Sequence, residues 1–263
     1  MIHSTAVIHA NARIGDNVEI GPYAVIGDHT VIGSGSKIGA HAFVEYADIG
    51  ENCSLFNHAS VGAAPQDLKY KNELTKLILG PRCTVREFVT LNRGTTAHEK
   101  TVIGSDCLFM AYTHVAHDCI IGNNVIMANV ATLGGHVEIG DNAFLGGMSA
   151  VHQFCRIGKL AMIGGGSMVS QDILPFVQTH GDRARLVGLN LVGLKRREYK
   201  TETIEEIKSA YRILFLSGLP MEEALDQVEA ANPGEEVRQM VAFIHSSKRG
   251  IVRPAKKENN EEV

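Results

Sequence analysis

Four histidines in this sequence fall along one edge of a repeating pattern: His114, His117, His136 and His152. The pattern is set by aliphatic residues 18 positions apart, namely Val115, Leu133 and Val151. The residues two positions after each of these are His117, Gly135 and Gln153. If 18 residues make one coil of a stacked structure, these three positions form a line across about 10 Å, with the other histidines beside it. We therefore expect the histidines to line a groove.

Imidazole groups in such a groove can do two kinds of chemistry. His117, followed directly by Asp118, suits a general base, because a carboxylate can fix an imidazole tautomer and the pKa of histidine lies near neutrality. The backbone N–H of Gly135 in the next coil could stabilise an oxyanion, since a glycine permits close approach of a substrate. Clustered imidazoles are also good zinc ligands. The residues alone leave open a general base, a metal site or simple turn residues.

The elements that must hold these residues are short strands. Apolar residues, nearly all aliphatic, recur every six positions, and the longest unbroken series is Ile103, Phe109, Val115, Ile121, Met127, Leu133, Ile139, Leu145, Val151, Ile157, Ile163 and Val169. Neither an α-helix nor an alternating strand has a period of six, but a short strand followed by a sharp turn does. Three such sides close a coil of 18 residues, and successive coils stack at about 4.8 Å. The sequence therefore predicts an all-β solenoid of hexapeptide repeats over residues 1–174.

Two segments interrupt the repeat, near residues 63–78 and 92–102. The first contains the sequence QDLKY at positions 66–70, and the second contains RGTT at positions 93–96. Loops inserted into a solenoid usually gather on one side and often carry function. The alternative is that both are tolerated surface insertions.

After Pro175 the hexads stop, and residues 175–263 are predicted to form a C-terminal α-helical domain. Residues 201–216 have the apolar spacing of an amphipathic helix, and Pro220 and Pro233 mark the starts of two more. Basic residues gather at positions 195–197. Such a patch can hold a phosphorylated ligand or an acidic partner protein, although exposed basic runs are often only solvated.

Composition excludes several other classes of protein. The net charge of -4 gives no basic footprint for nucleic acid. No apolar run approaches the roughly 18 residues that a transmembrane helix needs, and no secretory signal pattern is visible. The five cysteines are odd in number and never form CxxC, so we expect reduced core thiols rather than disulfides or a zinc framework. These features predict a soluble cytoplasmic protein.

Four stretches together resemble the bacterial UDP-N-acetylglucosamine O-acyltransferases: residues 66–70, 114–118, 148–155 and 193–197. The resemblance covers nearly the whole chain, in the same order and with both loops. It implies a left-handed parallel β-helix and a homotrimer with active sites between subunits. It also implies the first step of lipid A synthesis, in which a 3-hydroxyacyl chain passes from acyl carrier protein to the glucosamine 3-position of UDP-N-acetylglucosamine. We expect neither a cofactor nor a metal.

By position, the resemblance implies that His117 is the general base, with Asp118 beside it. It also implies that the N–H of Gly135 stabilises the oxyanion. The residues expected to bind substrate are Gln66, Asp67, Lys69, His114, His136, His152, Gln153, Gly165, Asn190, Arg196 and Arg197. Asn190, Arg196 and Arg197 would bind the UDP end, and Gly165 would leave room for a long acyl chain. The chain departs from close relatives at Asn92 and Arg183, where they often have histidine, and at Val192, where they often have glutamate.

Two other functions fit parts of the sequence. A metal-dependent hydratase of the γ-carbonic-anhydrase type is also built on hexads, but it needs three imidazoles on one ion and has no use for the loop at 66–70. A passive structural solenoid leaves the histidine edge unexplained.

Overall fold

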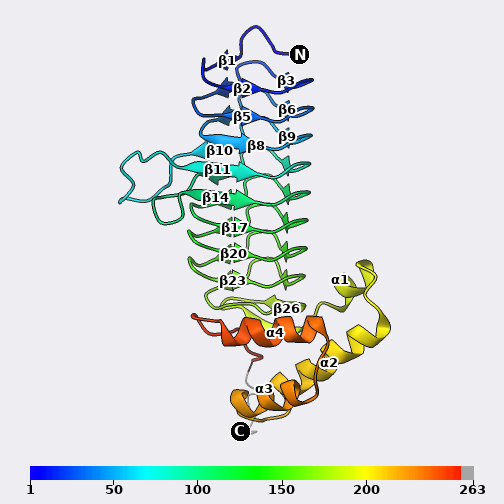
Figure 1. Ribbon diagram of the computed structural model, residues 1–263. Coiled ribbons are helices and arrows are strands. Elements are labelled where there is room, and N and C mark those ends of the chain that lie inside the picture. Colours follow the sequence, from blue (N-terminus) through cyan, green and yellow to red (C-terminus); the bar gives the residue numbers. More distant parts are fainter. Residues whose placement is uncertain (256–263) are drawn as a thin grey trace, which may run out of the picture.

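The computed structural model describes residues 1–255, which contain 27 strands and four helices. Most strands are two residues long, and the second residue of each is the aliphatic hexad residue. Successive side chains of a strand point to opposite faces, so the apolar hexad side chain points inward and its neighbour points outward. The strands stack into a tall column, with the helices at its C-terminal end (Figure 1).

Within residues 1–255 the strands form three sheets, one on each side of the column. The nine-stranded sheet contains β1 (Val7–Ile8), β4 (Val25–Ile26), β7 (Phe43–Val44), β10 (Ser60–Ala63), β13 (Thr90–Asn92), β16 (His114–Val115), β19 (Thr132–Leu133), β22 (Ala150–Val151) and β25 (Met168–Val169). The eight-stranded sheet contains β2 (Arg13–Ile14), β5 (Val31–Ile32), β8 (Ala47–Ile49), β11 (Lys76–Leu79), β14 (Lys100–Ile103), β17 (Ile120–Ile121), β20 (Glu138–Ile139) and β23 (Arg156–Ile157). The ten-stranded sheet contains β3 (Glu19–Ile20), β6 (Lys37–Ile38), β9 (Ser54–Leu55), β12 (Thr84–Val85), β15 (Leu108–Phe109), β18 (Ile126–Met127), β21 (Phe144–Leu145), β24 (Met162–Ile163), β26 (Val177–His180) and β27 (Arg185–Leu189).

The register between coils follows the 18-residue period. Val115 of β16 pairs in parallel with Leu133 of β19, and Leu133 pairs with Val151 of β22. The predicted line through these three residues is therefore confirmed. Because each hexad strand lies directly above the equivalent strand of the preceding coil, residues at equal distances past a strand meet at the same corner of the column.

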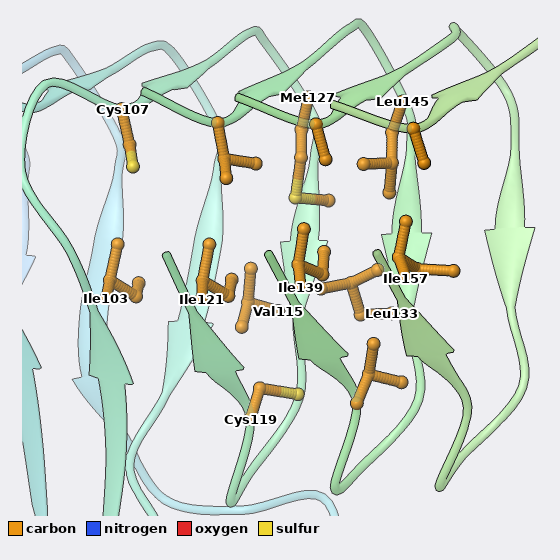
Figure 2. Packing of buried hydrophobic residues seen from close by; sticks show 14 of the residues in the cluster. Ile103, Cys107, Val115, Cys119, Ile121, Met127, Leu133, Ile139, Leu145 and Ile157 are labelled. Atoms are coloured by element: carbon orange, nitrogen blue, oxygen red, sulfur yellow. The ribbon is translucent and has the colours of Figure 1, made fainter. Parts of the chain in front are cut away.

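The core is a set of aliphatic rows that run along the column. Figure 2 shows Ile103, Ile121, Ile139 and Ile157 in one such row, and each is at most 3 % exposed. Burying one such side chain contributes about 1.5–3 kcal/mol, so the repeat itself supplies the energy that holds the corners in place. All five cysteines are free and buried, as the sequence predicts.

Both loops leave the column at one corner (Figure 1). Residues 64–75 connect β10 to β11, and residues 93–99 connect β13 to β14. In each case the chain passes from the nine-stranded to the eight-stranded sheet. The expectation that the loops gather on one side is confirmed.

The C-terminal part begins with strands rather than helices. β26 and β27 extend the ten-stranded sheet, and β27 is antiparallel to β26. The helices follow as α1 (Leu191–Arg196), α2 (Thr201–Leu216), α3 (Met221–Ala230) and α4 (Glu235–His245). α2, α3 and α4 match the predicted helices, whereas the hexad pattern predicts neither the last two strands nor α1. The division into domains at residue 174 stays a prediction, and residues 256–263 of the predicted helical domain lie outside the described residues. Among residues 1–255, no helix has the length and apolar content to span a membrane.

Candidate active site

The corner between the nine-stranded and eight-stranded sheets, called here the histidine corner, carries most of the predicted site. It comprises the turns at residues 116–119, 134–137 and 152–155 together with the loops at 64–75 and 93–99. Asp118, His136 and Phe154 occupy equivalent turn positions with φ between 60° and 65°. The rings of His136 and Phe154 stack with centroids 4.5 Å apart.

His117 and Asp118 form a hydrogen-bonded pair. The Nδ1 atom of His117 lies 2.7 Å from Oδ2 of Asp118. The side chain of Asp118 is fully buried, whereas that of His117 is 14 % exposed. A carboxylate accepts only, so Nδ1 carries the proton and Nε2 keeps a lone pair that can accept one. This is the arrangement of a general base whose tautomer is fixed by its neighbour.

Thr95 and His98, from the second loop, complete the surroundings of Asp118. Thr95 donates to Asp118 from its backbone N (2.9 Å) and from Oγ1 (2.6 Å), and the backbone N of His98 donates at 3.3 Å. Burial alone raises the pKa of the Asp118 carboxyl, but the hydrogen bonds from Thr95 and His117 outweigh it, so the pKa is lowered. The carboxylate thus stays charged. Sequence reasoning missed both residues, although the interrupted repeat near residues 92–102 signalled that their loop mattered.

Gly135 lies directly against the ring of His117. A Cβ added at Gly135 would meet Cε1 of His117 at 2.6 Å and Nε2 at 2.8 Å. The carbonyl of Gly135 accepts from Phe154 N, but among residues 1–255 its own N–H has no hydrogen-bond acceptor. An unpaired backbone donor beside an imidazole with a free lone pair can bind a developing oxyanion.

Two partly buried imidazoles near His117 favour the neutral form. Burial lowers the pKa of His114, and the nearby His117 lowers it further. Burial also lowers the pKa of His136, and this outweighs the opposing effect of Asp118. Nδ1 of His114 lies 2.7 Å from Oγ1 of Thr90. Neutral imidazoles can donate and accept hydrogen bonds at once, which suits contact with a polar substrate.

The predicted loop residues stand at the rim of the corner. Gln66 and Lys69 are exposed and Asp67 is half-buried. Oδ1 of Asp67 accepts from the backbone N of Lys69 at 2.9 Å, and the charge of Asp67 reaches His136, where it acts to raise the pKa of the imidazole. His152 and Gln153 are exposed in the coil beyond Gly135, where Gln153 packs over Gly134.

The remaining predicted residues lie elsewhere on the chain. Gly165 sits in the turn between β24 and β25, at the corner between the ten-stranded and nine-stranded sheets. Asn190 caps α1, where Oδ1 accepts from Gly193 N at 2.9 Å and Nδ2 donates to Leu160 O at 2.9 Å. Arg196 and Arg197 are exposed at the end of α1. A single chain therefore does not unite the predicted residues.

The corner also has the donors of a possible metal site. His117, Asp118 and His136 offer ligand atoms that all lie within 4.8 Å of one another. These are two imidazoles and a carboxylate rather than three imidazoles. Both oxygens of Asp118 already accept hydrogen bonds, so a metal ion bound here would compete with these bonds.

Comparison with known proteins identifies relatives with this architecture. Residues 172–252 match the model of domain 2 of UDP-N-acetylglucosamine O-acyltransferases, and residues 1–28, 11–46 and 100–135 match the bacterial transferase hexapeptide model. The acyl-[acyl-carrier-protein]–UDP-N-acetylglucosamine O-acyltransferase of Thermodesulfovibrio yellowstonii is 50 % identical over 208 residues, 78 % of this chain and 81 % of that protein. The corresponding protein of Aliarcobacter butzleri is 46 % identical over 204 residues, 77 % of this chain and 78 % of that protein.

Solved structures agree. The UDP-N-acetylglucosamine acyltransferase of Bacteroides fragilis is 43 % identical, covers 96 % of this chain and 100 % of its own, and has a TM-score of 0.94. The enzyme of Francisella novicida is 36 % identical, with coverages of 97 % and 95 % and a TM-score of 0.94. The fold is thus the left-handed parallel β-helix with C-terminal helices. With identities of 50 % over 78 % of its length and 43 % over 96 % of its length to two such relatives, this chain belongs to the acyl-[acyl-carrier-protein]–UDP-N-acetylglucosamine O-acyltransferase family.

Proposed function

We propose that the protein transfers a 3-hydroxyacyl chain from acyl carrier protein to the glucosamine 3-hydroxyl of UDP-N-acetylglucosamine, the first step of lipid A synthesis. The observation that carries the proposal is the placement of two groups side by side. The free Nε2 of His117 and the unpaired N–H of Gly135 meet at one corner. Acyl transfer needs one group to take a proton and another to hold the oxyanion.

The reaction follows from this geometry. Nε2 of His117 takes the proton of the sugar hydroxyl as its oxygen attacks the thioester carbonyl. The N–H of Gly135 donates a hydrogen bond to the oxyanion of the tetrahedral intermediate. As the C–S bond breaks, the imidazolium returns the proton to the departing thiolate of the carrier. Asp118 stabilises the imidazolium between the two transfers, because its carboxylate is charged and bonded to Nδ1.

Substrate recognition is divided between the histidine corner, the corner that carries Gly165, and α1 with its cap. In the proposal, Asp67, Lys69 and Gln66 contact the sugar, and His114, His136, His152 and Gln153 line the cleft beside His117. Asn190, Arg196 and Arg197 bind the UDP end. The Asn190 side chain already caps α1 and bonds to Leu160, so its hydrogen bonds to the ligand are additional to these. Gly165 borders the acyl groove, and a Cβ added there would contact only Gly147 O, at 3.2 Å, and Gly147 N, at 3.9 Å, so space remains for a long acyl chain.

A homotrimer would bring the two corners together. The corner that carries Gly165 also carries four exposed apolar side chains in successive coils, namely Phe88, Tyr112, Val130 and Met148. A soluble monomer rarely exposes so continuous an apolar strip. Packing this corner against the histidine corner of a second copy would cover the strip and complete a site. We place the protein in the cytoplasm, where both proposed substrates are made.

The test is transfer of 3-hydroxyacyl chains of graded length from acyl carrier protein to UDP-N-acetylglucosamine and to its 3-amino analogue, followed by mass spectrometry. Replacing His117→Ala should slow transfer by about 10²- to 10⁴-fold while the oligomer survives. His245→Gln, which alters an exposed histidine of α4, is the matched control and should keep the wild-type rate. Near-normal turnover by the His117 variant would overturn the base assignment.

A metal-dependent hydratase is the second candidate, favoured only by the convergence of His117, Asp118 and His136. It predicts stoichiometric zinc in the purified protein and hydratase activity that a chelator abolishes. The acyltransferase predicts transfer that a chelator leaves unchanged. Elemental analysis combined with the transfer assay separates the two.

A further inference from the structure

Arg93 is a nearly buried cation that the proposed reaction does not use. Its side chain is 7 % exposed and donates from Nη1 to Oε1 of Glu45 and to the carbonyl of Gly62, both at 2.8 Å. The guanidinium also lies over the ring of Tyr46, 4.3 Å from its centroid. Burying a charge is unfavourable unless it is paired and hydrogen-bonded. The partners of Arg93 come from separate coils, so its position is fixed by the column.

A further donor of this guanidinium, Nε, reaches into the first loop. Nε of Arg93 donates to Oη of Tyr70 at 3.0 Å, and Oη donates in turn to the carbonyl of Glu73 at 2.8 Å. Among residues 1–255, the bond from Arg93 to Tyr70 is the one hydrogen bond that joins residues 64–75 to the rest of the chain. The other hydrogen bonds of this loop are internal, and Leu68 is fully exposed.

Tyr70 is also tied to the residues that face the histidine corner. Its backbone N donates to the carbonyl of Asp67 at 3.0 Å, and Asp67 in turn holds Lys69. A shift of Tyr70 therefore moves Asp67 and Lys69 together. We propose that Arg93 is a positioning residue for substrate binding, which holds the loop so that Asp67 and Lys69 face the acceptor sugar. This rests on the proposed function for the identity of the sugar, but not for the anchoring itself.

Arginine is suited to this task because its planar fork makes several bonds at fixed angles, whereas lysine is a point charge on a flexible stem. Arg93→Lys keeps the charge opposite Glu45, so the fold is preserved, but it cannot reproduce the bond to Tyr70. Tyr70→Phe removes the same bond from the other side and leaves Arg93 and its buried partners intact. Arg82→Lys is the matched control, because Arg82 pairs with Asp106 on an exposed surface at a different corner.

In steady-state kinetics, Arg93→Lys and Tyr70→Phe should each raise the KM for UDP-N-acetylglucosamine by about 10- to 100-fold, since small misplacements of binding groups have effects of this size. The KM for the acyl carrier protein should change much less, and the double variant should be little worse than either single one. A fall in kcat with an unchanged KM for the sugar nucleotide would overturn the proposal.

A second measurement does not depend on activity. Trypsin can cut after Lys69 and Lys71, both exposed in the loop, and none of the substitutions changes the number of sites. Arg93→Lys and Tyr70→Phe should both be cut at these sites faster than the wild type. Mass spectrometry of the fragments would show this, and Arg82→Lys should be cut at the wild-type rate. Unchanged cleavage would refute the anchor. If the wild type transfers no acyl chain, the proposed function fails, and the cleavage rates still decide on Arg93.

Discussion

At the scale of single residues, the site consists of a few groups that limit one another's freedom. Asp118 receives hydrogen bonds from Thr95, His98 and His117. With its lone pairs thus engaged, the carboxylate can present only one orientation to the imidazole. His117 is therefore held against Gly135 rather than free to rotate toward solvent, which is the condition for an efficient base.

Gly135→Ala should disable this arrangement. The added Cβ would meet the ring of His117 at 2.6 Å, and Asp118 prevents the ring from moving without loss of its hydrogen bond. We expect kcat to fall by about 100-fold, the effect of a displacement of roughly 1 Å. Gly188→Ala, where a Cβ would meet no atom within 4 Å, should retain wild-type kcat. Wild-type turnover by Gly135→Ala would show that the imidazole does not need this position.

At the scale of elements, the short strands act through the residues they bury. Leu133 in β19 is fully buried between the coils that carry His117 and Gln153. Its side chain both stabilises the core and sets the spacing of the turns on either side. The position of the turn residues is thus a consequence of core packing one or two residues away.

Leu133→Ala should lower the free energy of unfolding by about 2–5 kcal/mol, because a rigid row of aliphatic side chains cannot collapse into the cavity. Val187→Ala in β27, where the valine is 63 % exposed, should change it by about 0.5 kcal/mol or less. Denaturant unfolding of both variants measures the difference. Equal destabilisation by the two would contradict the view that the inward rows carry the stability.

The hexad period predicts these elements because each strand obeys a local rule. The inward position of Leu133, the alignment of His117 with Gly135 and both interrupting loops all follow from counting. The contacts of Thr95 and His98 with Asp118 do not, because they join residues about 20 positions apart through a loop of irregular backbone. β26 and β27 also escape prediction, since an antiparallel pair no longer repeats the hexad.

At the scale of the whole molecule, a partly buried histidine links folding to pH. The pKa of His114 is lowered by burial and by His117, so the unfolded chain binds a proton there more readily than the folded one. His114 therefore contributes stability that is complete above the unfolded pKa of about 6.5 and is lost as the pH falls toward its lower folded pKa.

We expect the melting temperature of the wild type to fall between pH 7.5 and 5.5 by more than that of His114→Gln, whose amide can still bond to Thr90 but does not titrate. His245→Gln, at an exposed site on α4, should show the wild-type dependence. Differential scanning calorimetry at a series of pH values measures this. An identical fall in all three proteins would contradict a role for His114.

The 18-residue register also restricts how the chain can change in length. A whole coil added between β2 and β5 would lengthen the column and return every later residue to its own corner, because parallel strands repeat the same register. The same coil added between β16 and β19 would carry Gly135 about 4.8 Å further from His117. Within the regular hexads, insertions and deletions are therefore tolerated as whole coils, and none is tolerated between the coil that carries His117 and the coil that carries Gly135.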